Sequence, residues 1–331
     1  MHSSATMNAP MSGLVQNNTV EVSVRGVWQR VPAIEIDGRV IAVKGDRVKL
    51  AVIRDEDFIE GELDHPERVV AALKQARTLG VRADIFTFAQ GIDSGKPRYS
   101  YPMEWQSVAA ARTSSFKAWW DSLPQEGRKN VRRAEKRGVT VVVKQLDEDL
   151  IRDICELNND SPMRQGRRFV HYGKTIEEVR KDQAPLLDRS EYVCAYFENE
   201  LIGFLKLAFA GKTAALVQVL PKASHHDKRP ANALLAKAIE LCEARGAAYL
   251  TYGLFQEGNR RESPLREFKI RNRFEEVLVP RYYVPLTVWG TISTRLRLYR
   301  GPIGLLPDPA LRMAIVARAK WYSLRSSKTP V

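Results

Sequence analysis

The sequence predicts an α+β fold of two lobes, each a mixed and mostly antiparallel sheet flanked by helices, followed by a helical C-terminal tail. The chain has 331 residues, which is longer than one average domain. Short apolar runs joined by two-residue turns recur along it, and such runs are typical of antiparallel hairpins. Amphipathic helical patterns stand between the runs, and a hydrophobic content of 44% suffices for the cores.

The first lobe is expected to span residues 20–138, after a flexible tail at residues 1–19. The runs VEVSVRG, PAIEIDGRVIAV and VKLAVI predict an antiparallel meander. A helix follows, with Asp64 as its cap, Pro66 in its first turn and Gly80 at its end. The runs RADIFTFAQ and MEWQSVAAA predict two further strands.

A strongly basic helical segment, broken near Pro124, ends this lobe. Six cations of the segment fall within about half of a helical wheel: Arg128, Lys129, Arg132, Arg133, Lys136 and Arg137. A solvated basic face and a phosphate-binding face both fit this pattern.

The second lobe is expected to span residues 139–289. It begins with a strand and the helix DEDLIRDICELNND, followed by an Arg-rich loop and the helix TIEEVRKDQAPLL. The runs EYVCAYFE, LIGFLKLAFA and TAALVQVL then predict three antiparallel strands. A long helix, with Asp227 as its cap, Pro230 in its first turn and Gly246 at its end, precedes the strand AAYLTYG. The helix ESPLREFKIRN and the strand VLVPRYYVPLTVW close the lobe, and residues 290–331 predict a basic helical tail.

The net charge indicates which kinds of partner the chain could bind, and the cysteines indicate its cellular compartment. A net charge of +13 and a pI near 9.7 favour nucleic acid, nucleotide phosphates or anionic lipid as partners. Cys155, Cys194 and Cys242 lie in apolar patterns, which predicts core thiols in a reducing cytoplasm. No apolar run approaches the ~20 residues of a membrane span. We expect a cytoplasmic protein, and the tail leaves peripheral contact with an anionic inner-membrane surface as an alternative.

A cluster of polar and cationic residues, HHDKR at residues 225–229, stands directly ahead of the long helix. The free N–H groups and the dipole at a helix N-terminus favour an anion. The segment therefore predicts an anion site at this point of the second lobe.

The element order over residues 146–288 resembles the GNAT acyltransferase fold. Three stretches are similar to the branch of that family that includes the Fem-type peptidyltransferases: WWDSLPQEGRKNVRRAEKRGVTV, KRPANALLAKAIELCEARG and LREFKIRNRF. On this resemblance the first lobe is a degenerate GNAT-like copy, and the second is the catalytic lobe.

The resemblance implies a place for the acyl donor. In GNAT enzymes two core strands part, the donor carbonyl bonds to the exposed strand edge, and the pyrophosphate rests on the following helix N-terminus. Acyl-CoA, such as acetyl-CoA, would then contact Val219, His226, Lys228, Arg229, Ala231 and Asn232. Arg229 stands where the family usually has a glycine. Fem-type relatives take their acyl group from aminoacyl-tRNA, which is the alternative donor here. No metal is expected, because no residues have metal-ligand spacing.

Four residues are candidates for the catalytic steps. His226 has the right side chain to deprotonate an acceptor amine. Phe268 stands where many GNAT enzymes carry a tyrosine acid, so Tyr283 is a candidate substitute. Lys269 would neutralise charge on the leaving group, and Glu257 lies where GNAT acceptors often reach.

The Arg-rich loop is expected to line the acceptor pocket with Arg167, Arg168, His171 and Tyr172, together with Tyr252. A basic, aromatic lining favours an anionic acceptor such as a carboxylated sugar, a nucleotide-linked sugar or a phospholipid. The expected function is direct acyl transfer to an amine or hydroxyl of a small molecule, a sugar or a cell-envelope precursor. The alternatives are an aminoacyl-tRNA-dependent peptidyltransferase and an inactive GNAT-like module that binds polyanions. The oligomeric state stays open.

Overall fold

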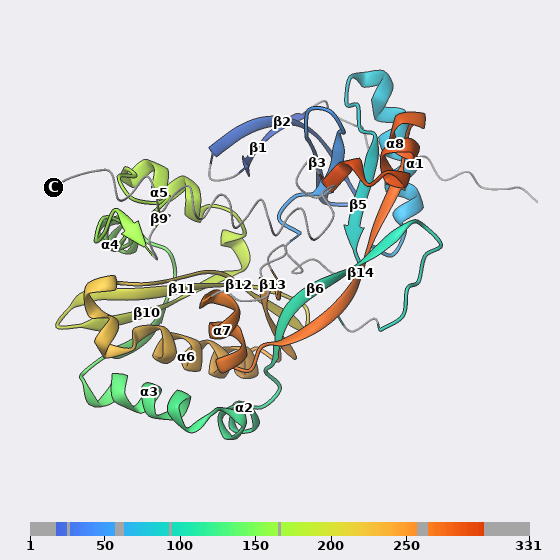
Figure 1. Ribbon diagram of the computed structural model, residues 1–331. Helices are drawn as coiled ribbons and strands as arrows, with labels where there is room; N and C mark the ends of the chain where they lie inside the picture. Colours follow the sequence, from blue (N-terminus) through green and yellow to red (C-terminus); the bar gives the residue numbers. More distant parts are fainter. Residues whose placement is uncertain are drawn as a thin grey trace, which may run out of the picture.

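One continuous sheet joins two groups of helices in the computed structural model of the chain (Figure 1). The structure describes residues 18–24, 27–56, 63–92, 95–164, 167–256 and 264–300. Among these residues, no helix combines the length and the apolar character that crossing a bilayer requires. Most of both predicted tails lies outside the described residues.

The main sheet has twelve strands in the order β1-β2-β3-β4-β5-β14-β6-β13-β12-β11-β10-β7. Its strands are β1 (Asn18–Val24), β2 (Val27–Ile36), β3 (Arg39–Lys44), β4 (Leu50–Ile53), β5 (Ile85–Ala89), β6 (Met103–Arg112), β7 (Thr140–Lys144), β10 (Ser190–Phe197), β11 (Glu200–Ala210), β12 (Thr213–Pro221), β13 (Tyr249–Leu254) and β14 (Glu275–Pro285). A separate small hairpin pairs β8 (Met163–Arg164) with β9 (Arg167–Arg168).

The α-helices are α1 (Pro66–Ala76), α2 (Phe116–Ser122), α3 (Gln125–Lys136), α4 (Glu148–Asn158), α5 (Ile176–Gln183), α6 (Pro230–Ala244), α7 (Pro264–Arg271) and α8 (Val288–Arg295). Short 3₁₀ turns are η1 (Arg77–Leu79), η2 (Leu187–Arg189), η3 (Ala223–Lys228) and η4 (Leu298–Arg300). In the second lobe α4 and α5 cover one face of the sheet, and α6, with α3 packed on it, covers the other.

The two lobes repeat one βαβ arrangement. In the first lobe β4 and β5 are parallel neighbours connected through α1, and in the second lobe β12 and β13 are parallel neighbours connected through α6. Both helices begin with a proline, Pro66 and Pro230, whose missing N–H costs nothing in a first turn. The predicted α+β class with two similar lobes is confirmed.

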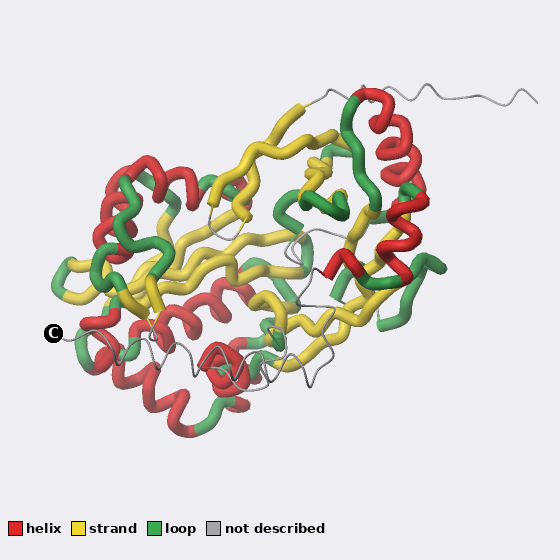
Figure 2. Tube along the Cα trace, turned by 45° about the horizontal axis from the view of Figure 1, so that its top comes forward, coloured by secondary structure: helices red, strands yellow, loops and turns green. Residues whose placement is uncertain are grey.

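The last strand of each lobe is exchanged with the other. β6 comes from the first half of the chain but pairs with β13, and β14 comes from the second half but pairs with β5. β6 and β14 also pair with each other, so the sheet passes without a break between the lobes (Figure 2). The predicted boundary at residues 138/139 divides the chain into two halves. The sheet is not divided there, because β6 and β14 each pair with a strand from the other half.

Most of the predicted elements are present, and three local predictions are wrong. Asp64 does not cap α1, because His65 is the N-cap residue. Asp227 does not cap α6, because Arg229 is the N-cap residue and the Asp227 carboxylate accepts a hydrogen bond from Arg137 Nη1 at 2.9 Å. The closing strand was predicted to continue to Trp289, but it ends at Pro285. Helix α8 begins at Val288, and the side chain of Thr287 caps it.

Candidate functional site

β12 and β13 part after a short parallel contact. They pair at Thr213↔Tyr249, Ala214↔Leu250 and Ala215↔Thr251, and no later pair joins them among the described residues. A bulge in the pairing of β13 with β6 falls between Thr251 and Leu254, and Gly253 within it has a φ of +55°. From Leu216 onward, the edge of β12 that faces β13 therefore has no pairing with that strand.

The N-terminus of α6 follows directly after β12. Arg229 precedes the helix in the left-handed conformation, with φ 58° and ψ 40°, and no side chain caps the helix. For a residue with a Cβ this conformation costs ~1–2 kcal/mol, which glycine avoids. Ala231 and Asn232 lie in the first turn, and both residues are half-buried. Pro230 has no N–H group and the N–H of Asn232 donates to the Arg229 carbonyl at 3.1 Å, so what this helix end offers an anion is chiefly its dipole and the neighbouring cations.

The cations at this helix end are partly neutralised by acidic neighbours. Lys222 and His225 both contact Glu200, the latter from Nε2 at 3.2 Å, and the hydrogen bond from Lys222 is the main cause that lowers the pKa of Glu200. Lys228 Nζ lies 4.5 Å from the centre of the Phe197 ring and 3.8 Å from Asp227 Oδ1. His226 is exposed.

A cavity of about 740 Å³ lies between the two lobes. The second lobe contributes Val217 and Gln218 of β12 and Gly253 and Leu254 of β13, at the point where these strands part. The first lobe contributes residues of β1, β2 and β4, and Arg281 of β14 completes that wall. The parted strands thus open onto a space large enough for a small-molecule substrate.

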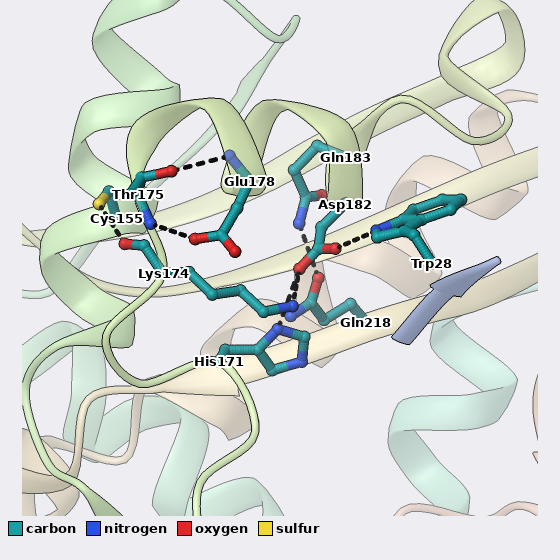
Figure 3. A network of polar contacts seen from close by, with 9 residues as sticks. All are labelled: Trp28, Cys155, His171, Lys174, Thr175, Glu178, Asp182, Gln183 and Gln218. Atoms are coloured by element: carbon teal, nitrogen blue, oxygen red, sulfur yellow. Dashed lines mark hydrogen bonds and ion pairs between the residues drawn. The ribbon is translucent and has the colours of Figure 1, made fainter. Parts of the chain in front are cut away.

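Asp182 at the end of α5 is the centre of a polar network in this cavity (Figure 3). Its Oδ1 accepts a hydrogen bond from Trp28 Nε1 at 3.0 Å, and its Oδ2 contacts both His171 Nδ1, at 3.3 Å, and Lys174 Nζ. Burial by itself would raise the pKa of Asp182, but the hydrogen bonds from His171, Lys174 and Trp28 outweigh it and hold the pKa at about 2. The carboxylate is therefore ionised at neutral pH.

Lys206 of β11 lies beside this network and is 1% exposed. Its Nζ donates to the carbonyls of Gln183 and Pro185, both at 2.7 Å, and thereby ties the end of α5 to the sheet. Gln183 Nε2 in turn donates to Gln218 Oε1 at 2.9 Å. Burial lowers the pKa of Lys206 to about 8.

The opposite wall of the cavity carries a second, half-buried ion pair. Arg281 Nη2 donates to Glu56 Oε2 at 2.7 Å, with the two side chains 15% and 11% exposed, and Arg281 Nε donates to Gln106. Residues of both charges line the cavity: Glu21, Asp55, Glu56 and Asp182 against Lys44, Arg54, Lys206 and Arg281. The lining is therefore mixed in charge, whereas the sequence of the loop alone predicts a basic one.

The predicted acceptor residues are dispersed. His171 lines the cavity, whereas Tyr172 and Arg168 are exposed on the loop and do not belong to the lining. Tyr252 packs against Phe268 and Phe274 in the core beneath α6. The side chain of Arg167 lies outside what the structure describes.

The predicted catalytic residues are also separated. Lys269 is buried, and its Nζ donates to the carbonyl of Leu254, a cavity residue, at 2.7 Å. Tyr283 stacks on Tyr299 with ring centres 4.2 Å apart, and burial raises its pKa. Val219, predicted to contact the donor, is half-buried on β12. Glu257 lies outside the described residues.

Sequence reasoning missed Asp182, Lys206 and Gln218. Lys206 carries a detectable signal, because it is a charged residue in the otherwise apolar run LIGFLKLAFA. Asp182 carries none, since an acid near the end of an amphipathic helix is ordinary. Only the fold brings Asp182 to a residue of β2, 154 positions away in the sequence.

No protein-family model matches the sequence, and a search of curated proteins returned no match. Among solved structures, L-PGS from Bacillus licheniformis matches with a TM-score of 0.51 and 13% identity, over 78% of this chain and 85% of that one. A domain assigned to a lysylphosphatidylglycerol synthetase from Agrobacterium fabrum matches with a TM-score of 0.50 and 14% identity, over 80% and 87% of the two chains. The chain has a tandem GNAT-like fold.

The tandem GNAT-like fold agrees with the resemblance noted in the sequence. The crystal structure of FemX is also similar, with a TM-score of 0.48 and 12% identity over 80% of this chain and 88% of that one. At these identities the matches to L-PGS and to the Agrobacterium fabrum domain establish a shared fold, and the chemistry has to be argued from the site.

Proposed function

We propose that this chain is an acyltransferase that moves an acyl group from acyl-CoA to an amine or hydroxyl of an acceptor in the inter-lobe cavity. One observation carries the proposal: the unpaired edge of β12 lies between the N-terminus of α6 and a cavity of about 740 Å³. A thioester carbonyl bonded to that edge would place its carbon beside the cavity, and the phosphates of its carrier would reach the helix end.

The donor site is proposed to consist of His226, Lys228 and Arg229 around the first turn of α6. Backbone N–H groups of the unpaired edge would stabilise the oxyanion that forms when the acceptor attacks. Lys269 is proposed to act by fixing Leu254 at the parted strands, since its ammonium is bonded to that carbonyl. The acceptor is a small molecule, a sugar or a cell-envelope precursor, which suits a cytoplasmic enzyme near the inner membrane.

An aminoacyl-tRNA donor is the second candidate, and a specific contact favours it. The basic helix α3 connects to the donor site through Arg137, which donates to the Asp227 carboxylate at 2.9 Å. Lys129, Arg132 and Lys136 of α3 are exposed, so the cationic surface extends beyond the space that a CoA phosphate needs. Arg229 also occupies the position where glycine would let a pyrophosphate approach the backbone.

The test offers both donors to the pure protein. Radiolabelled acetyl-CoA and tRNA charged with labelled amino acids are incubated separately with an amino sugar, a nucleotide-linked sugar and vesicles of an anionic phospholipid. Calorimetric titration with acetyl-CoA measures donor binding independently of transfer. We expect acetyl-CoA binding that Lys228→Ala and Arg229→Ala each weaken, because each change removes a cation from the proposed donor site.

Each remaining outcome excludes a candidate. Transfer from charged tRNA without acetyl-CoA binding would replace the first donor with the second. Binding of tRNA with transfer from neither donor would contradict an acyltransferase and favour an inactive polyanion-binding module.

A further inference from the structure

We propose that His171 is the general base that takes the proton from the attacking acceptor, and that Asp182 and Trp28 position it. This inference rests on the proposed acyltransferase function and names a residue of the same site. The observation behind it is that a histidine, its carboxylate partner and the parted strands all line one cavity.

The position of His171 suits a base for the acceptor. The residue lies in the loop between β9 and α5, and it shares the cavity lining with Gln218 of β12 and Gly253 of β13. Its side chain is 28% exposed, so the ring is held yet accessible. A nucleophile in the cavity would therefore lie between the imidazole and an acyl group on the β12 edge.

The contact with Asp182 sets the tautomer of His171. Nδ1 lies 3.3 Å from Asp182 Oδ2, and an ionised carboxylate only accepts hydrogen bonds. Nδ1 of the neutral ring thus carries the hydrogen, and Nε2 has the lone pair that accepts a proton (Figure 3). The carboxylate also stabilises the imidazolium that forms, as in other His–carboxylate pairs.

Hydrogen-bond donors around the pair hold Asp182 in place. Lys174 contacts the same carboxylate oxygen as His171, and Trp28 holds the other oxygen from the first lobe. Lys181, the residue before Asp182, donates to Glu21 of β1 at 3.0 Å and lies 5.1 Å from the Trp28 ring centre. The β1–β2 hairpin is thereby fastened to α5, so the first lobe takes part in positioning the base.

The other histidines near the donor site are less suited to this step. His225 contacts Glu200 through Nε2, and its Nδ1 is buried without a partner among the described residues. His226, the base that the sequence suggests, is exposed and does not belong to the cavity lining.

The proposed step balances in atoms and electrons. The lone pair of the acceptor nitrogen or oxygen forms a bond to the acyl carbon, and His171 Nε2 takes a proton from that nucleophile, which keeps the electron pair of the broken N–H or O–H bond. The bond from the acyl carbon to the carrier sulfur, or to the ribose oxygen of a tRNA, then breaks with its electron pair. The leaving group recovers a proton from the imidazolium, directly or through water, and the base is regenerated.

The experiment compares His171→Gln and His171→Gly with the wild type, using whichever donor and acceptor the wild type turns over. We expect kcat to fall by about 100-fold or more with the donor KM unchanged, because a positioned base contributes about that much. Free imidazole restores turnover of the glycine variant, and the acidic limb of the pH–rate profile flattens in the glutamine variant. Asp182→Asn and Trp28→Phe are expected to lower kcat by smaller factors. Both variants should still show the acidic limb of the pH–rate profile, because His171 is present in each. His65→Gln, on an exposed histidine ahead of α1, is the matched control and keeps the wild-type rate.

The outcomes separate this inference from the proposed function. If the wild type transfers the acyl group and the His171→Gln variant keeps more than half of the wild-type kcat, only the role of His171 is overturned. A folded glycine variant that binds donor but does not respond to imidazole also overturns it. A wild type that binds neither donor and transfers from neither overturns both proposals.

Discussion

Lys206 is a buried cation whose hydrogen-bond partners are carbonyl groups. The ammonium is 1% exposed and bonds to two backbone oxygens at the end of α5. Burial is the main cause of its lowered pKa, and the charge of Asp55 opposes the shift. A lysine of this kind makes the stability of the fold depend on pH in the alkaline range.

Replacement of Lys206 by methionine tests this dependence. The pKa of Lys206 is about 8 in the fold against an ordinary value of 10.5, so between these pH values unfolding takes up a proton. Wild-type stability therefore rises with pH across that window, relative to Lys206→Met, by up to roughly 3 kcal/mol. Urea unfolding of both proteins at several pH values from 7 to 10 measures the difference between their free energies of unfolding. If that difference does not change with pH, the pKa of Lys206 is not lowered and the prediction is wrong.

Single residues of the site were predictable only in part. His171 and the cations ahead of α6 are visible in the sequence because they cluster in polar segments. The partners that decide their roles are distant in the chain, as Trp28 is from Asp182 and Glu200 is from His225. Whether a cation is available to a ligand depends on such partners, and no local pattern encodes them.

At the scale of elements, periodicity predicted the helices and strands well, because buried faces repeat with the helical or strand period. The helix starts were less predictable. Asp64 and Asp227 are suitable capping residues by type, yet neither is the N-cap residue, and Asp227 bonds to Arg137 of α3 instead. Capping by an acid competes with its long-range ion pairs, and the tertiary contact decides.

The exposed cations of α3 allow a quantitative test of nucleic-acid binding. If α3 binds tRNA, the triple change Lys129→Glu, Arg132→Glu and Lys136→Glu should weaken binding and reduce the slope of log K against log salt by roughly 2 to 3. Fluorescence anisotropy with labelled tRNA at several salt concentrations measures the slope.

The matched control reverses two exposed cations of α1 and the exposed cation directly after it: Arg68→Glu, Lys74→Glu and Arg77→Glu. This triple has the same effect on net charge, so the global electrostatic contribution is equal. Equal losses in both triples would contradict a tRNA site on α3.

At the scale of the molecule, the sequence predicted two lobes but not the exchange of β6 and β14. Their places in the chain predict β6 in the first lobe and β14 in the second, since a hydrophobic pattern shows that a strand exists without showing its neighbour. The pairing of β6 with β13 and of β14 with β5 places the end of each lobe in the sheet of the other. The inter-lobe cavity depends on this pairing and was not predictable for the same reason.

The exchange predicts that neither lobe folds alone. Residues 139–331 without β6 leave the edge of β13 unpaired, and β14 loses both of its neighbours. We expect separately produced fragments 1–138 and 139–331 to lack a cooperative urea transition by circular dichroism, and a refolded mixture to regain one.

The control is the full chain with a protease site inserted at the exposed turn after α3 and cleaved once folded. Its halves should stay associated, because the paired strands still hold them together after the peptide link is cut. Two separate transitions in the uncut protein would contradict the prediction.

Crossed strands also restrict how such a protein can change over evolutionary time. Deleting either half of the gene would remove an inner strand from the half that remains, so a shortened descendant would need a replacement strand before it could fold. Each lobe therefore supplies a strand that the sheet of the other lobe needs.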